Sequence, residues 1–211
     1  MAVTEYKTVE KENSDEFVEK RSRFIGHVKP VSTEAEAVEF VNSVKQKHWD
    51  ATHNVWAYVL KDNNIYRYSD DGEPSGTAGV PVLDVLLKSK VVNAAVVVTR
   101  YFGGTLLGAG GLVRAYSHAS KIAVESGGII TMALCNVFSV TVDYSFYDRL
   151  NIILADFGTI VEGTEFTDKV TVTASIRASR FEELNAKLFD QSNGQYLAVK
   201  IDERFGKASD Y

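Results

Sequence analysis

Apolar and polar residues alternate over several short stretches of this chain, which is the pattern of β-strands with one buried face. Residues 23–31 follow it, with Pro30 near their end. Residues 52–60 and 65–68 follow it too, and the polar residues 61–64 between them are typical of a turn, so we expect a β-hairpin. Residues 91–99 are instead a continuous β-branched run, which predicts a strand buried on both faces.

Apolar residues at helical spacing predict three helices in the same part of the chain. The first follows a capping box of Thr33 and Glu36, whose side chains each bond a free backbone N–H, and it ends near Lys47. The second begins at Pro81, and the third follows the glycine-rich residues 100–111 and ends at residues 126–128. Their inward-facing stripes are Ala37, Phe40, Val41 and Val44; Val82, Leu83, Leu86 and Leu87; and Leu112, Ala115, Ala119, Ile122 and Ala123.

From about residue 133 the pattern restarts and predicts a second domain. Its order is a strand at 136–143, a helix capped by Ser145 and Asp148, strands at 159–166 and 170–178, a helix capped by Ser179 and Glu182, and a strand at 196–201. This βαββαβ order is ferredoxin-like. We therefore predict an α+β protein of two domains, residues 1–130 and 134–207, with a linker within 127–134.

The composition is that of a globular protein, with 45% hydrophobic and 24% charged residues. No run approaches the roughly 18 apolar residues of a membrane span, and no apolar segment typical of a signal peptide stands near the start. We therefore expect a cytoplasmic protein without membrane contact. The single cysteine, Cys135, excludes an internal disulfide, and we interpret it as a small buried apolar residue.

The formal net charge is -5, and neither half of the chain is basic, since residues 1–133 carry 15 Lys and Arg against 16 Asp and Glu and residues 134–211 carry 8 against 12. This excludes the strongly basic domain that is typical of a nucleic-acid binder. Contact with nucleic acid would have to come from a local patch, such as Lys20, Arg21 and Arg23. The alternative interpretation of this triplet is a solvated strand edge.

The glycine-rich residues 100–111 stand between a strand and a helix, where free N–H groups and the helix dipole favour an anion. The spacing is neither a Walker loop nor the dinucleotide fingerprint, since Val113 holds the third-glycine place. Arg100 and Arg114 would add positive charge. The alternative is that the glycines only permit a tight loop and close packing. These glycines are Gly103, Gly104, Gly108, Gly110 and Gly111.

Residues 69–79 form an acidic loop that carries Asp70, Asp71, Glu73, Ser75 and Thr77. The three acids would offer oxygen ligands to Mg²⁺, or a base near a substrate, but the EF-hand pattern is absent. An Asp-Gly pair is also simply a good turn. We favour a polar recognition loop over a solvated turn, and we predict neither a bound metal nor a cofactor.

His53 stands at the mouth of a predicted strand, where a histidine serves either as a proton carrier or as a structural residue. The hairpin aromatics Trp56, Tyr58, Tyr66 and Tyr68 alternate along their strands. They would form either a platform on which bases stack or part of the core.

Four segments carry a resemblance to the YigZ/IMPACT family. They are residues 69–79 (SDDGEPSGTAG), residues 99–116 (TRYFGGTLLGAGGLVRAY), residues 20–24 (KRSRF) and residues 51–54 (ATHN). The resemblance implies a first domain with the fold shared by the second domain of a small-subunit ribosomal protein, elongation factor G domain IV and small-molecule kinases of the GHMP type. It implies a second, ferredoxin-like domain similar to the last domain of elongation factor G.

The same resemblance implies a connection with translation. Many relatives of the first fold bind RNA or nucleotides, and eukaryotic IMPACT proteins modulate translation initiation by competing for the activator of a stress kinase. We expect no counterpart here of the extra N-terminal domain that makes the eukaryotic contact, and the resemblance implies no agreed reaction for the bacterial branch. Because fold analogy is only an associational argument, function has to be argued from the site.

The leading hypothesis is a non-enzymatic cytoplasmic protein that contacts RNA, the ribosome or a translation factor. The contact would use a cleft formed by His53, residues 70–79 and residues 100–114, with Arg100 and Arg114 meeting phosphate or a carboxylate. The second hypothesis is an enzyme or a binder of a small anionic ligand, such as a nucleotide phosphate, in the same cleft. A third is a structural adaptor. The sequence predicts no oligomeric state.

Overall fold

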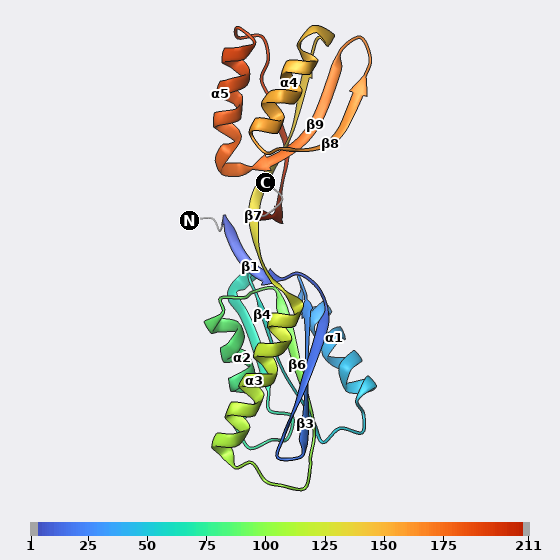
Figure 1. Ribbon diagram of the computed structural model, residues 1–211, viewed down its shortest axis with the longest axis vertical. Helices are drawn as coiled ribbons and strands as arrows, with labels where there is room; N and C mark the ends of the chain where they lie inside the picture. Colours follow the sequence, from blue (N-terminus) through green and yellow to red (C-terminus); the bar gives the residue numbers. More distant parts are fainter. Residues whose placement is uncertain (1–3, 209–211) are drawn as a thin grey trace. The chain divides into compact units, whose positions relative to one another are not determined.

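The computed structural model describes residues 4–208, which divide into two compact units (Figure 1). The first unit is Tyr6–Ile130, and the second begins at Thr131 and also includes Thr4 and Glu5. The segment 127–134, expected as a linker, contains the end of helix α3 (Ala109–Gly127) and the start of strand β7 (Ile129–Val142). The domain limits 1–130 and 134–207 stay a prediction.

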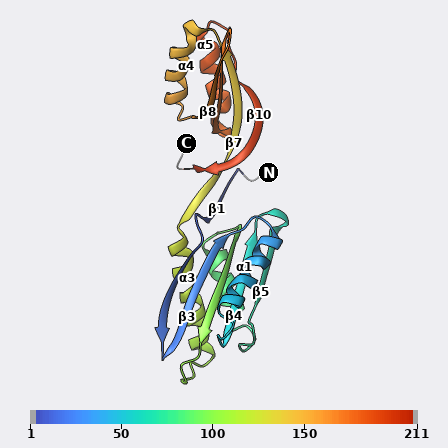
Figure 2. The same ribbon diagram turned by 90° about the vertical axis from the view of Figure 1, so that its right-hand side faces the viewer.

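The first unit is an antiparallel sheet with helices on both faces (Figure 2). Helix α1 (Glu34–Lys47) packs on one face, and helices α2 (Gly79–Lys88) and α3 pack on the other. In spatial order the strands are β2 (Asn13–Glu19), β3 (Ser22–Pro30), β6 (Ala94–Tyr101), β4 (His53–Leu60) and β5 (Ile65–Ser69).

Strand β6 lies in the middle of this sheet and is buried on both faces, as the β-branched run predicted. Val96 and Val98 face α2 and α3, whereas Ala95 and Val97 face α1. The strand begins at Ala94 rather than at residue 91. Val91 instead bridges to Lys7 in β1 (Glu5–Val9).

The second unit has the ferredoxin-like order, with neighbours β10–β7–β9–β8 all antiparallel. Strand β1 joins the same sheet beside β7. The buried residues of α4 and α5 share one core with β7 and β9. The elements are β7, α4 (Tyr144–Asp156), β8 (Ile160–Phe166), β9 (Val170–Arg177), α5 (Phe181–Gln191) and β10 (Val199–Lys207).

Of the three predicted capping boxes, the structure contains the first. The Thr33 hydroxyl accepts from the Glu36 N–H at 3.2 Å, and the Glu36 carboxylate accepts from the Ser32 N–H at 2.7 Å. The other two are wrong, because each helix starts elsewhere. Helix α4 begins before Ser145, and Ser179 lies in a 3₁₀ turn (Ala178–Arg180) that precedes α5.

The interpretation of the hairpin aromatics as one stacking platform is also wrong. Register pairs Tyr66 with Val59 and Tyr68 with Ala57, so both tyrosines lie on the face opposite Trp56 and Tyr58. Trp56 and Tyr58 stack on each other, with ring centroids 5.6 Å apart. Four aromatics split between two faces cannot act as one stacking surface.

Among residues 4–208, no helix is both long and apolar enough to cross a membrane.

Candidate functional site

Asp70 organises the acidic loop from within. Its carboxylate accepts hydrogen bonds from the backbone N–H groups of Gly76 at 3.0 Å, Ala78 at 3.1 Å and Gly79 at 2.7 Å. These bonds close the loop and satisfy free N–H groups at the start of α2, which is the role of a helix cap. Asp70 therefore shapes the loop, and its carboxylate is already occupied.

Asp71 fastens the loop to two other elements. Its carboxylate accepts from the Asn54 N–H of β4 at 2.7 Å and pairs with Lys45 of α1 at 2.6 Å. Its backbone carbonyl accepts from Nδ1 of His53 at 2.8 Å. Ser75 is exposed, and the Thr77 hydroxyl donates back to the Pro74 carbonyl at 2.7 Å. Within the described part of the chain, no group of three or more His, Cys, Asp and Glu side chains is placed to hold a metal ion.

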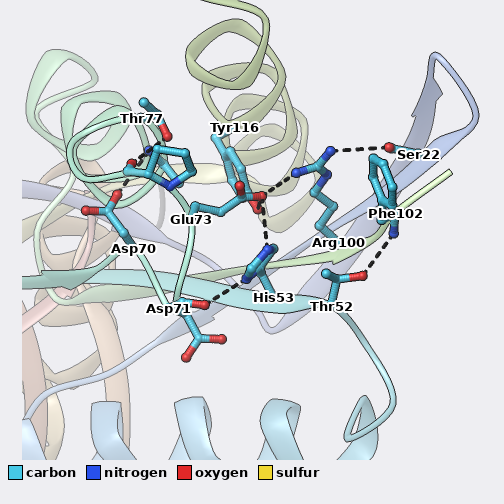
Figure 3. Close-up of polar contacts among 12 residues, drawn as sticks. Ser22, Thr52, His53, Asp70, Asp71, Glu73, Thr77, Arg100, Phe102 and Tyr116 are labelled. Atoms are coloured by element: carbon cyan, nitrogen blue, oxygen red, sulfur yellow. Dashed lines mark hydrogen bonds and ion pairs between the residues drawn. The ribbon is translucent and has the colours of Figure 1, made fainter. Parts of the chain in front are cut away.

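The Glu73 side chain, by contrast, is buried in the first unit, where the residue is 8% exposed. One carboxylate oxygen, Oε1, lies 2.5 Å from Nη1 of Arg100 and 2.8 Å from the Tyr116 hydroxyl (Figure 3). Nε2 of His53 approaches the same oxygen at 3.8 Å. A loop, two neighbouring strands and helix α3 thus meet at one carboxylate.

Arg100 is 5% exposed and lies against two phenylalanine rings, 5.5 Å from the centroid of Phe24 and 5.4 Å from that of Phe102. Its Nη2 donates to the Ser22 hydroxyl at 3.5 Å. Its Nε is buried with no hydrogen-bond partner among the described residues. Because Glu73 balances its charge, Arg100 is not an unpaired cation. Burial, reinforced by the Glu73 charge, raises the pKa of Tyr116, which stays a neutral donor.

The geometry around His53 determines which ring nitrogen carries the proton. A carbonyl oxygen only accepts, so Nδ1 must donate to Asp71. In the neutral ring this leaves a lone pair on Nε2, on the side of Glu73. The backbone of the acidic loop therefore holds the orientation of the His53 ring, with Nε2 on the side of Glu73.

These side chains border a pocket of about 430 Å³, here called the His53 pocket. Its rim is apolar, since Leu106 is 81% and Phe102 44% exposed. The start of α3 forms another side, where the cap residue Gly108 offers no side-chain bond and Gly108–Gly110 are exposed. The lining residues are Thr52, His53, Gly72, Glu73, Pro74, Arg100, Phe102, Leu106, Leu107, Gly108, Ala109 and Leu112.

The remaining predicted residues lie around this pocket rather than in its lining. Gly103 packs on the β2–β3 turn, where an added Cβ would lie 2.1 Å from the Arg21 carbonyl carbon and oxygen. A Cβ added at Gly104 would meet nothing within 4 Å. Gly110 and Gly111 lie inside the first turn of α3 rather than ahead of it. Arg114 lines a separate pocket of about 260 Å³ together with Lys20 and His118.

The structure therefore brings together His53, Glu73 and Arg100 from the predicted set, and it assigns Asp70 and Asp71 to holding the loop. The sequence interpretation missed Tyr116, Ser22, Thr52 and Phe102. Only Tyr116 carried a signal, because it lies four residues after Leu112 on the buried side of the helix. A tyrosine on an inward face needs a hydrogen-bond partner for its hydroxyl.

The fold and this site define a two-domain α+β protein with a partly buried polar pocket in its first unit. Residues 20–124 match the Impact N-terminal domain, and residues 140–195 match a Domain of unknown function (DUF1949). The chain is 37% identical to the IMPACT family member YvyE of Bacillus subtilis (strain 168) over 191 residues, which cover 90% of this chain and 88% of that protein. The chain belongs to the IMPACT family.

Two further relatives show the extent of the similarity. The IMPACT family member YigZ of Escherichia coli (strain K12) is 33% identical over 87% of this chain and 92% of that protein. The Protein IMPACT homolog of Dictyostelium discoideum is 39% identical, but over only 43% of this chain and 27% of that protein. A crystal structure described as a hypothetical protein superposes with a TM-score of 0.61 and 29% identity, covering 95% of this chain and 99% of the other.

Proposed function

We propose that this chain is a cytoplasmic, translation-associated protein that binds RNA, the ribosome or a translation factor through its first unit. The observation that supports this most is the start of α3, which is exposed, lacks a side-chain cap and opens beside the His53 pocket. Free N–H groups at a helix start attract phosphate, and the exposed ring of Phe102 offers a face for a base. The resemblance of both domains to translation proteins points the same way.

Co-sedimentation with ribosomes from a lysate tests this function across a salt series. Leu106 is 81% exposed on the rim of the pocket, so Leu106→Glu adds a negative charge there without disturbing the core. Ile152 in α4 is 63% exposed and supplies the matched control Ile152→Glu in the second unit. We expect salt-sensitive association that falls about tenfold in Leu106→Glu, which corresponds to about 1.4 kcal/mol, and is unchanged in Ile152→Glu.

The two ways of failing have different meanings. A wild-type protein that does not sediment with ribosomes at low salt contradicts the proposed function. A wild-type protein that sediments, with both variants equal to it, contradicts only the choice of the pocket as the contact.

A second candidate function is the binding or conversion of a small anionic ligand. The specific observation is His53, whose Nε2 lies on the side of a buried carboxylate and whose ring lines the pocket. A screen of phosphate compounds by thermal shift tests it, because a ligand at a hundredfold excess over its Kd stabilises by about 2.7 kcal/mol. Nucleotides or metabolites that leave Tm unchanged count against this candidate.

A further inference from the structure

Three basic side chains line the second pocket, which shares Leu107 with the His53 pocket, and a fourth is their neighbour in the β2–β3 turn. Lys20, Arg114 and His118 line its volume of about 260 Å³, and Arg21 is the other residue of the β2–β3 turn. All four are exposed. Together we call them the basic turn surface.

The cations of this surface are not neutralised by neighbours. Elsewhere in the unit, Arg23 pairs with Glu16, Lys45 with Asp71, and Arg100 with Glu73. Across residues 4–208, by contrast, Lys20, Arg21 and Arg114 form no ion pair. Glu19 is the one acid that lines the pocket. In a chain of net charge -5, three unpaired cations at one place favour an anionic partner.

The turn that carries Lys20 and Arg21 has an unusual backbone. Their φ angles are 45° and 68°, so both residues occupy the left-handed region without being glycine. Two-residue hairpin turns of this kind usually use Asn-Gly, and each bulkier residue costs roughly 1 kcal/mol. Residues held in such conformations are concentrated at functional sites.

The glycine loop holds this turn in place. Gly103 lies so close to Arg21 that an added Cβ would stand 2.1 Å from its carbonyl carbon and oxygen, and the Gly103 N–H donates to the Ser22 hydroxyl at 3.2 Å. The backbone of the turn is therefore packed against Gly103. The two basic side chains are left at the exposed tip of the hairpin.

The first turn of α3 adds to the positive character of the surface. A Cβ on Gly110 would meet only Nη1 of Arg114, at 3.9 Å, so the guanidinium lies over a bare stretch of helix backbone. The cap residue Gly108 leaves the first N–H groups without a side-chain partner. Unsatisfied N–H groups and the helix dipole stabilise a phosphate at this end of the helix.

From these observations we infer that the basic turn surface binds the phosphate backbone of single-stranded RNA. The inference rests on the proposed function and specifies its partner. Several exposed cations beside an open helix start suit a polyanion, because each neutralised phosphate releases counterions and adds to affinity. The buried Arg100 takes no part in it, since Glu73 already balances its charge.

The test is fluorescence anisotropy with a labelled 12-nucleotide oligouridylate over a salt series. The variant is Arg21→Glu with Arg114→Glu. The control, Lys88→Glu with Lys121→Glu, reverses the same number of charges at exposed lysines that already pair with Asp84 and Glu125. We expect the Kd of the variant to rise at least about tenfold and the slope of log K against log salt to shrink by roughly 1.4, or 0.7 for each lost phosphate contact. The control should bind like the wild type.

Equal losses in the variant and the control would show general electrostatics and overturn the inference, as would a variant that binds like the wild type. A wild-type protein that does not bind the oligonucleotide overturns it as well. The neutral pair Arg21→Gln with Arg114→Gln should show an intermediate loss, and circular dichroism checks that each variant is folded.

Ribosome co-sedimentation of the same variant separates this inference from the function on which it rests. If wild type and variant sediment equally with ribosomes and neither binds the oligonucleotide, the proposed function stands and RNA binding by the basic turn surface is refuted. If the wild type binds the oligonucleotide through this surface but never sediments with ribosomes, the surface stands and the translation role is refuted.

Discussion

Glu73 is the residue on which the His53 pocket depends, because one of its oxygens serves Arg100 and Tyr116 and faces His53. Forming such a buried ion pair yields little net stability, since both charges lose their water. Removing one partner is far more costly, because the other charge stays buried and unpaired. The pair therefore makes the pocket geometry sensitive to single substitutions.

Glu73→Gln should lower the free energy of unfolding by about 3 to 5 kcal/mol, because it leaves the Arg100 guanidinium without a countercharge. Tyr116→Phe removes one hydrogen bond to the carboxylate and should cost less, roughly 1.5 to 3 kcal/mol. Urea unfolding followed by tryptophan fluorescence measures both values. The two tryptophans of the chain, Trp49 and Trp56, both lie in the first unit. A smaller cost for Glu73→Gln than for Tyr116→Phe would contradict the ion-pair assignment.

His27 should make the first unit sensitive to acid. Burial, with smaller contributions from His48 and Lys47, lowers the pKa of His27 to about 4. In the unfolded chain its pKa is about 6.5. Between about pH 4 and pH 6.5, His27 is therefore protonated in the unfolded state and neutral in the folded state. Stability is therefore full above pH 6.5 and falls as the pH drops toward 4, by about 3 kcal/mol from this residue.

Unfolding free energies of wild type and His27→Gln at intervals from pH 7 to pH 4 measure this contribution. The carboxylates titrate in both proteins, so the difference between the two curves isolates His27. The wild-type curve should fall more steeply. Parallel curves would show that His27 does not resist protonation.

At the scale of elements, the start and direction of α3 matter most, since this helix borders both pockets and covers the sheet. Its contact with β3 is unusually close at Gly26, where an added Cβ would stand 2.3 Å from the Ala119 carbonyl oxygen and 2.8 Å from the Ala123 Cβ. A backbone oxygen cannot swing away as a flexible side chain can. Gly26 therefore sets the distance between helix and sheet.

Gly26→Ala should destabilise the first unit by about 1 to 3 kcal/mol, because the helix must move off the sheet. Gly110→Ala is the matched control in α3 itself, with only the Arg114 guanidinium within 4 Å of its Cβ. Alanine is the better helix former by about 1 kcal/mol, so this variant should be unchanged or more stable. Urea unfolding followed by tryptophan fluorescence compares the two variants. Equal unfolding midpoints would show that the contact at Gly26 does not set the distance between helix and sheet.

At the scale of the whole molecule, the two units have separate cores. Buried residues of β3, β4, β6 and the three helices α1 to α3 form the core of the first unit on both faces of its sheet. The second core consists of residues from Phe138 onward. Each unit therefore buries its apolar residues without help from the other, which is the physical requirement for a domain.

A fragment of residues 6–130 should fold alone. It keeps both helical layers and the bridge between Lys7 and Val91. We expect one cooperative urea transition in tryptophan fluorescence, with a midpoint close to that of the full chain. A fragment without a cooperative transition would show that the first unit needs the rest of the chain.

Local patterns along the chain were sufficient for most of the elements and for the region of the site. Strands and helices were predictable because apolar side chains must face a core at a period of two or 3.6 residues. The predicted capping box at Thr33 is confirmed because it depends only on residues close in sequence. The boxes predicted at Ser145 and Ser179 are wrong because the helices begin at the neighbouring residues Tyr144 and Phe181. The glycine-rich and acidic loops were recognisable from composition alone.

The roles of the charged residues were decided only by the tertiary structure. Arg100 and Arg114 look equivalent in the sequence, yet one is buried against Glu73, 27 residues away, and the other is exposed and unpaired within the described chain. Ser22 meets Arg100 across 78 residues of chain. Whether a charge is balanced depends on which distant groups the fold brings within a few ångströms, and no local pattern contains that information.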